Sequence, residues 1–172
     1  QYAAEELQRA LHKMCGAKVP ITDQPQEGLP FHILIGTPQS STAIETADLF
    51  AADNPEEVRV VRSGELLYLA GPTPRAALYA TYTFLQECLG MRWFWPGLSG
   101  EYVPQQERIA IEELDLRHIP SLEVRSLAIN SPHYDESTLI WMARNRMNVH
   151  NLQGSASRIP PMKRRGFQVV IG

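Results

Sequence analysis

Residues 64–96 decide the fold; they read GELLYLAGPTPRAALYATYTFLQECLGMRWFWP. Leu66–Ala70 is rich in residues that favour strands. Thr73 and Pro74 are a typical helix start, since threonine can cap free N–H groups and proline lacks only an N–H that would have no helical partner there. Apolar residues then recur at helical spacing until Gly90, and aromatic residues follow. The stretch therefore predicts a strand, a capped helix and an aromatic exit.

The residues around this stretch extend it into a small α/β layer. The expected elements, in chain order, are a helix over residues 3–14 that stops at Gly16, a strand over 31–35, a short helix from Ser40 or Ser41, a strand over Val58–Val61 and a strand over 108–111. Ser63-Gly64 joins two of the strands as a hairpin, because glycine accepts the positive φ of a tight turn. This order predicts an α+β fold, a small sheet with helices packed on it, over residues 1–112.

The pattern changes after Glu113 to strands that alternate with a helix. The expected elements are a strand over Leu122–Ile129, a helix over Glu136–Asn145, and strands over Met147–His150 and Phe167–Ile171. Such alternation begins a (β/α) barrel, which needs at least about 200 residues when it is complete. We therefore expect residues 113–172 to be the first strands of a truncated (β/α)8 barrel that follows the amino-terminal domain.

Composition and charge limit the expected partners. Of the 172 residues, 44% are hydrophobic and 20% are charged, and the formal net charge is −3. Modules that bind nucleic acid usually carry a basic face, so no nucleic acid partner is expected. The basic cluster Lys163 to Arg165 follows two prolines and is interpreted as a solvated loop. No apolar run reaches the roughly 18 to 20 residues that a membrane-spanning segment needs.

The sequence lacks the common motifs for cofactors, metals and nucleophilic catalysis. It has no glycine-rich nucleotide loop, no G-x-S-x-G elbow and no histidines at zinc spacing, so no cofactor and no metal are expected. Cys15 and Cys88 lie near the ends of two expected helices and are interpreted as buried thiols, with a disulfide bridge between them as the alternative. Asp135 and Glu136 could be a glycosidase acid pair. At a helix start, however, they are interpreted as groups that stabilise the N-terminus.

Trp93, Trp95 and Tyr102 are the first candidates for contact with a sugar. Flat apolar rings cover large areas, and the tryptophan N–H can still donate a hydrogen bond, so these residues could form a sugar platform. Alternatively, they form a plug between domains. The plug is favoured, since the segment joins the two expected domains and aromatic anchors suit such interfaces.

Arg125, Asn130 and His150 are the second group of candidates. Asn130 and His150 lie at the carboxyl ends of the first two barrel-like strands, where barrel enzymes place their ligand-binding groups. Arg125 lies nearer the middle of its strand and could point inward. The simpler interpretation is that Asn130 caps a turn and that His150 is a hydrogen-bonded core residue.

Ten short motifs, taken in order, resemble one family. They are AAEELQR (3–9), GAKVPI (16–21), ILIG (33–36), LAG (69–71), RAALY (75–79), TFL (83–85), LGMRWF (89–94), EYVP (101–104), PSLEVR (120–125) and WMARNRMN (141–148). They are similar to the amino-terminal domain before the barrel in α-glucuronidases, β-N-acetylhexosaminidases and related uncharacterised Bacteroides-type glycoside hydrolases. The uncharacterised group is the most similar, above all over Leu89–Pro96 and Glu101–Pro104.

This resemblance implies a hexosaminidase N-terminal-domain-like fold and a non-catalytic accessory role in a glycoside hydrolase. The partners would be carbohydrate and the missing catalytic barrel of the same polypeptide, and the location would be the periplasm or the cell exterior. Arg125 would hold sugar hydroxyls, while the catalytic carboxylates would come from later strands, so the isolated chain is expected to be inactive. Two other hypotheses remain open, a structural interaction domain and a carbohydrate-binding module that uses Trp93, Trp95 and Tyr102.

Overall fold

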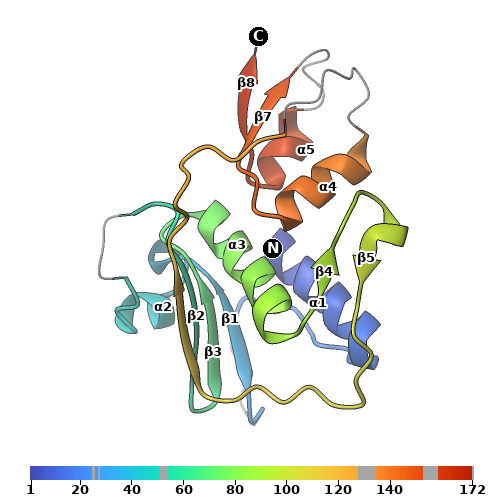
Figure 1. The fold of residues 1–172 in the computed structure, drawn as a ribbon. Helices are drawn as coiled ribbons and strands as arrows, with labels where there is room; N and C mark the ends of the chain where they lie inside the picture. The colour runs from blue at the N-terminus through green and yellow to red at the C-terminus, as the bar shows by residue number, and fades with distance from the viewer. Residues whose placement is uncertain (25, 27, 51–53, 128–134, 153–158, 172) are drawn as a thin grey trace. The chain divides into compact units, whose positions relative to one another are not determined.

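The computed structural model describes residues 1–172 except 25, 27, 51–53, 128–134, 153–158 and 172 (Figure 1). These residues form two compact units. The first comprises residues 1–91 and 103–119, and the second comprises residues 92–102 and 120–172. The first unit thus extends past residue 112, and the aromatic segment belongs to the second. Within the described ranges, no helix combines the length and the apolar character needed to cross a membrane.

A four-stranded mixed sheet forms the base of the first unit. Its strands are β1 (His32–Gly36), β2 (Val58–Ser63), β3 (Leu66–Ala70) and β6 (Leu114–His118), in the spatial order β1-β3-β2-β6. β1 and β3 are parallel, whereas β2 is antiparallel to both of its neighbours. The predicted hairpin between β2 and β3 is confirmed, and Gly64 in its turn has a φ of 60°.

Helices pack on this sheet, which confirms the α+β class (Figure 1). The helices α1 (Tyr2–Cys15) and α3 (Pro74–Thr83) pack against each other, and α3 covers the sheet face on which Leu69 is completely buried. The short helix α2 (Thr42–Thr46) covers part of the other face, where Ile44 packs against residues of β3. The core of the unit therefore lies between the sheet and α3.

The ends of α1 and α3 follow the predicted capping pattern. α1 ends at Gly16, whose φ of 74° lets its N–H donate back to the last helical turn. Thr73 begins α3, because its side chain accepts a hydrogen bond from an N–H of the first turn at 3.2 Å. A wider π-helical turn over Phe84–Cys88 follows α3 before Gly90 ends the helix, also with a φ of 74°.

The fourth strand is β6, so the strand predicted over residues 108–111 is wrong. β6 alternates leucines with polar and charged residues, as a strand with one solvent face does. Its register against β2 is supported by two diagonal ion pairs. Arg59 donates to Asp115 at 2.6 Å, and Arg117 donates to the buried Glu57 at 2.7 Å. These cross-strand pairs agree with the observed register, and a search for local alternation could not show them.

The second unit combines a short hairpin, two helices and a parallel strand pair. Its elements are β4 (Arg92–Trp93), β5 (Glu101–Tyr102), α4 (Glu136–Arg144), β7 (Val149–Leu152), α5 (Ile159–Arg164) and β8 (Gln168–Ile171). The hairpin strands β4 and β5 are antiparallel, and β7 and β8 are parallel. The predicted α4, β7 and β8 are thus confirmed to within a few residues. The helix α5 has prolines in its first turn and includes Lys163 and Arg164, two residues of the cluster that the sequence pattern places in a loop.

The strand predicted over Leu122–Ile129 is not formed in its described part, residues 122–127. The buried side chain of Asn148 holds this segment instead. Its Oδ1 accepts the N–H of Arg125 at 2.8 Å, and its Nδ2 donates to the carbonyl of Glu123 at 2.7 Å. Because side-chain bonds replace a regular ladder there, the segment runs beside the start of β7 without becoming a strand. A barrel start and a hexosaminidase-like fold remain predictions.

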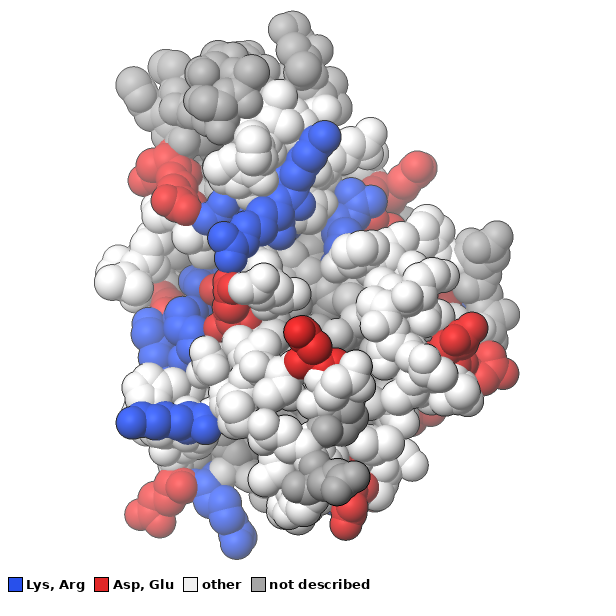
Figure 2. All heavy atoms as spheres, turned by 180° about the vertical axis from the view of Figure 1, so that it is seen from behind, with Lys and Arg blue, Asp and Glu red and all other residues white. Residues whose placement is uncertain are grey.

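Charges on the surface are mixed. On the face drawn in Figure 2, basic and acidic side chains are interspersed among uncharged ones. Several of the charges pair across strands, as Arg62 does with the exposed Glu113. Exposed pairs of this kind contribute little to stability, typically below about 1 kcal/mol.

Candidate functional site

The hairpin of β4 and β5 carries the aromatic residues that the sequence singled out. Trp93 pairs with Glu101, and Arg92 pairs with Tyr102. Neighbouring side chains of a strand point to opposite faces, so Trp93 and Glu101 share one face and Arg92 and Tyr102 share the other. Trp93 is only 4% exposed, whereas Tyr102 is 54% exposed. The hairpin therefore separates the aromatic candidates into a buried and an exposed group.

Trp93 anchors the buried face of the hairpin to α4. Its Nε1 donates to Oε1 of Glu101 at 3.1 Å, and the guanidinium of Arg144 lies 5.5 Å from the centroid of its ring. Arg144 Nη1 lies 3.6 Å from the same Glu101 oxygen. Trp141 and Asn145 donate side-chain hydrogen bonds to the carbonyl of Trp93 at 2.9 and 3.2 Å. We call Trp93, Glu101 and Arg144 the hairpin clamp.

Phe94, Trp95 and Tyr102 form the exposed group, which we call the aromatic face. Their side chains are 60%, 54% and 54% exposed. The N–H of Phe94 donates to the carbonyl of Gly100 at 2.9 Å, which continues the pairing by one residue and directs Phe94 to the same side as Tyr102. The rings of Phe94 and Trp95 have centroids 6.1 Å apart. Of the proposed sugar platform, Trp95 and Tyr102 are accessible and Trp93 is not.

The turn of the hairpin holds Trp95 in place. Its Nε1 donates to the hydroxyl of Ser99 at 3.2 Å. Gly100 lies against its backbone so closely that a Cβ there would be 2.0 Å from the Trp95 carbonyl oxygen. Gly97, with a φ of 88°, makes the turn possible. The indole is therefore exposed to solvent and still restrained.

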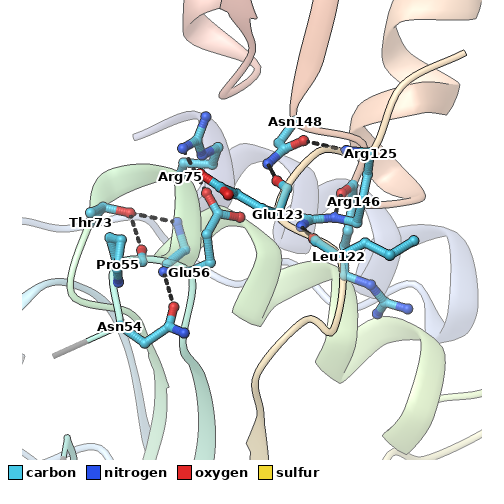
Figure 3. A network of polar contacts seen from close by, with 11 residues as sticks. Asn54, Pro55, Glu56, Thr73, Arg75, Leu122, Glu123, Arg125, Arg146 and Asn148 are labelled. Atoms are coloured by element: carbon cyan, nitrogen blue, oxygen red, sulfur yellow. Dashed lines mark hydrogen bonds and ion pairs between the residues drawn. The ribbon is translucent and has the colours of Figure 1, made fainter. Parts of the chain in front are cut away.

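Arg125 is bonded within its own unit, as Figure 3 shows. Its Nε donates to the carbonyl of Arg146 at 2.8 Å, and its Nη1 donates to the carbonyl of Leu122 at 2.6 Å. The buried Asn148 binds the backbone of the same residue. A sugar hydroxyl at Arg125 would have to compete with these carbonyls, and the sugar-binding role of this arginine stays a prediction.

The other two polar candidates are His150, which the structure describes, and Asn130, which it does not. His150 lies in β7, is 3% exposed and contacts the edge of the Phe167 ring, with centroids 6.1 Å apart. This burial agrees with a core residue. Asn130 lies outside the described residues. The structure brings the backbone of Arg125 to the start of β7, where its carbonyl accepts the N–H of Val149 at 3.3 Å.

Asp135 is the N-cap of α4, which confirms its interpretation as a capping residue. Its Oδ1 accepts the N–H of Thr138 at 2.8 Å and the hydroxyls of Ser137 and Thr138, both at 2.9 Å. These hydrogen bonds, first of all the one from the backbone of Thr138, hold the pKa of Asp135 below its usual range. The carboxylate is therefore kept ionised at neutral pH in a structural role.

The basic cluster is divided by α5. Lys163 and Arg164 are exposed in the last turn of this helix. Arg165 is only 7% exposed, where it donates to the carbonyl of Pro161 at 2.9 Å and to a carboxylate oxygen of Glu136. The interpretation of the whole cluster as a solvated loop is wrong, because Arg165 links α5 to the start of α4.

Glu101 and Asn148 are the two important polar residues that sequence reasoning missed. Glu101 has a side chain only 2% exposed and joins both other members of the hairpin clamp. Asn148 is 4% exposed and bonds two backbone groups. A signal existed for Asn148, since an amide between Met147 and Val149 at a strand start requires a partner when it is buried.

Polar groups of the first unit also hold the fold. The buried Glu6 accepts the hydroxyl of Tyr82 at 3.3 Å and lies 3.4 Å from Arg9. Figure 3 also draws Arg75 and Glu56, which form an ion pair with Nη2 and Oε1 2.6 Å apart. These contacts join α1 to α3, and α3 to the loop before β2.

Side chains that could bind metal and the two cysteines can be placed where the structure describes them. Among the residues that the structure describes, no three ligand-type side chains gather as a metal site would require. Cys15 and Cys88 are free thiols here, and their interpretation as buried is wrong, because Cys15 is half-buried and Cys88 is exposed. Burial, followed by the charge of Glu87, raises the pKa of Cys88, which lowers its fraction of reactive thiolate.

A scan against models of protein families found no match to the chain, and a search of curated proteins found none either. The aromatic face and the polar contacts beneath it are therefore interpreted from their own chemistry.

Proposed function

We propose that this chain is a non-catalytic accessory part of a glycoside hydrolase that acts on polysaccharide or glycan, and that it supports the catalytic barrel. The parallel pair of β7 and β8, with α5 in the connection between them, carries the proposal. A strand, a helix and a parallel strand are the repeating unit of such a barrel. The ten motifs quoted above supply the enzyme class. They also imply the periplasm or the cell exterior as the location.

The roles of the carboxylates support an accessory function. Glycoside hydrolysis commonly uses two carboxyl groups on either side of the scissile bond, about 5 to 10 Å apart. Three carboxylates of the second unit have structural partners instead. Asp135 caps α4, Glu136 binds Arg165, and Glu101 belongs to the hairpin clamp. This favours catalytic groups that come from another part of the polypeptide.

Two measurements test the proposal. The purified chain, assayed with 4-nitrophenyl glycosides and with soluble xylan, glucan and mannan, should release no product above the buffer blank. The coding sequence after Gly172 should continue into further strand–helix repeats that carry a pair of carboxylates. The accessory role would be overturned if the chain hydrolysed a substrate and Asp135→Asn abolished this activity without loss of the fold. It would also be overturned if the downstream sequence lacked such repeats.

A further inference from the structure

The aromatic face is exposed although its position is fixed. More than half of each of the side chains of Phe94, Trp95 and Tyr102 is accessible. Ser99 and Gly100 restrain Trp95, and the hairpin clamp fixes the strands beneath it. A rigid aromatic ring loses little freedom when a ligand binds, and surfaces of this kind are typical of recognition sites.

The area of the aromatic face indicates the size of its ligand. An aromatic side chain buries about 150–250 Å² when it is fully covered. With 54–60% of each side chain exposed, the three residues offer roughly 250–450 Å². A standard protein–protein interface buries about 800 Å² on each partner, around twice this area. The aromatic face is therefore too small for a stable protein partner and suits a small flat ligand.

We propose that the aromatic face is a carbohydrate-binding site on which a pyranose ring stacks against Trp95. One side of a pyranose presents C–H groups to a flat apolar ring, and its hydroxyls need polar partners at the edge. Tyr102 supplies a phenolic hydroxyl, and the exposed Arg92 lies on the same side of the hairpin in direct register. Phe94 extends the apolar surface beside the indole. This site rests on the proposed function for the class of its ligand.

Charge favours a sugar over a nucleobase at this site. Nucleobases also stack on aromatic side chains, but proteins that use them this way combine the rings with a positively charged groove that follows the phosphates. This chain has a formal net charge of −3, and the charged residues of the hairpin segment 92–102 are Arg92 and, on its opposite face, Glu101. A neutral glycan needs no such groove.

The test compares variants of the whole chain in native affinity gels and in calorimetry, with soluble xylan, mixed-linkage glucan and galactomannan as probes. The wild type should be retarded by at least one of them. Trp95→Ala should weaken that binding by about tenfold or more, since it removes about 100 Å² of apolar contact. Trp95→Tyr, which keeps a ring, should lose less. Leu98→Ala is the matched control, because it removes an apolar side chain that is 82% exposed in the same turn but carries no ring.

Four outcomes would overturn the site. These are no retardation by any of the three glycans, unchanged binding by Trp95→Ala, equal loss in Leu98→Ala, and binding of oligo-dT that depends on Trp95. Fluorescence from Trp93 and Trp141 shows whether each variant is folded. The proposed accessory function is tested by a different measurement, the hydrolysis of glycosides by the purified chain. A chain that binds glycan through Trp95 and also hydrolyses it would refute only the accessory role.

Discussion

Removal of Glu101 should strongly destabilise the second unit. Glu101→Ala leaves the guanidinium of Arg144, 12% exposed, without the carboxylate that lies 3.6 Å away, and it removes the acceptor of the Trp93 Nε1. Removing one partner of a buried ion pair costs about 3–5 kcal/mol, because the other charge stays in a poorly solvated place. Arg144 keeps its contact with the Trp93 ring, so we expect a loss near the lower limit, about 3 kcal/mol.

The position of the tryptophans makes this loss measurable for one unit alone. The chain has 3 tryptophans, Trp93, Trp95 and Trp141, and all lie in the second unit. Urea unfolding followed by tryptophan fluorescence therefore reports that unit, while far-UV circular dichroism reports both. The series consists of Glu101→Ala, Arg144→Met and the double variant. The double variant should be more stable than Glu101→Ala, since it also removes the buried guanidinium that has lost its carboxylate.

A double variant whose destabilisation equals the sum of the single ones would refute this reasoning, because the two charges would then act independently. Asp115→Asn in the first unit is the matched control, a pair in which the arginine is 13% exposed but the carboxylate is exposed. It weakens the contact of Asp115, 65% exposed, with Arg59. We expect the free energy of unfolding measured by circular dichroism to change by at most about 1 kcal/mol. The urea midpoint measured by tryptophan fluorescence should not change.

Two further predictions concern a helix start in each unit. Hydrogen bonds hold the pKa of Asp135 in the folded state below its unfolded value of about 3.9. The ionised carboxylate therefore stabilises the fold fully above about pH 3.9, and this stabilisation is lost as the pH falls through the folded pKa. Asp135→Ala should therefore cost about 0.5–2 kcal/mol at pH 7, and its difference from wild type in fluorescence-monitored unfolding should shrink below about pH 4. Gly71→Ala would place a Cβ 2.4 Å from that of Ala76 and 2.5 Å from the Ala76 backbone carbon, so unfolding followed by circular dichroism should show a loss of about 1–3 kcal/mol or more. An unchanged dichroism midpoint in that variant would contradict this close contact.

Local signals predicted the helices well, because their ends depend on residues close in sequence. Gly16 supplies a left-handed stop for α1, and Thr73 and Asp135 accept N–H groups from their own first turns. The hairpin at Gly64 has the same local origin. In each case the group that stabilises the structure and the backbone that needs it lie within one turn of each other.

Strand positions were harder to predict, because their partners lie far away in the sequence. The register of β6 is supported by the pairs that Arg59 and Arg117 form with Asp115 and Glu57, across a separation of 56 and 60 residues. The segment around Arg125 resembled a strand in its pattern, but the buried amide of Asn148 occupies the backbone groups that a ladder would use. Neither effect is visible in a window of a few residues.

In the candidate site, too, local sequence did not show which of three adjacent aromatic residues are buried, because this depends on a partner across the hairpin. Composition alone makes Trp93 and Trp95 equivalent, and the sequence analysis places both in one cluster, as a platform or as a plug. Once Glu101 stands opposite Trp93, the two-residue period of the strand sends Trp93 inward and Phe94 outward, and the turn at Gly97 then sets Trp95 against Ser99. Buried Glu101 accepts the Trp93 N–H, so the inner tryptophan is fixed by a polar partner and the outer one stays accessible. Trp95, which is 54% exposed and bonded to Ser99, is therefore the tryptophan to test for binding.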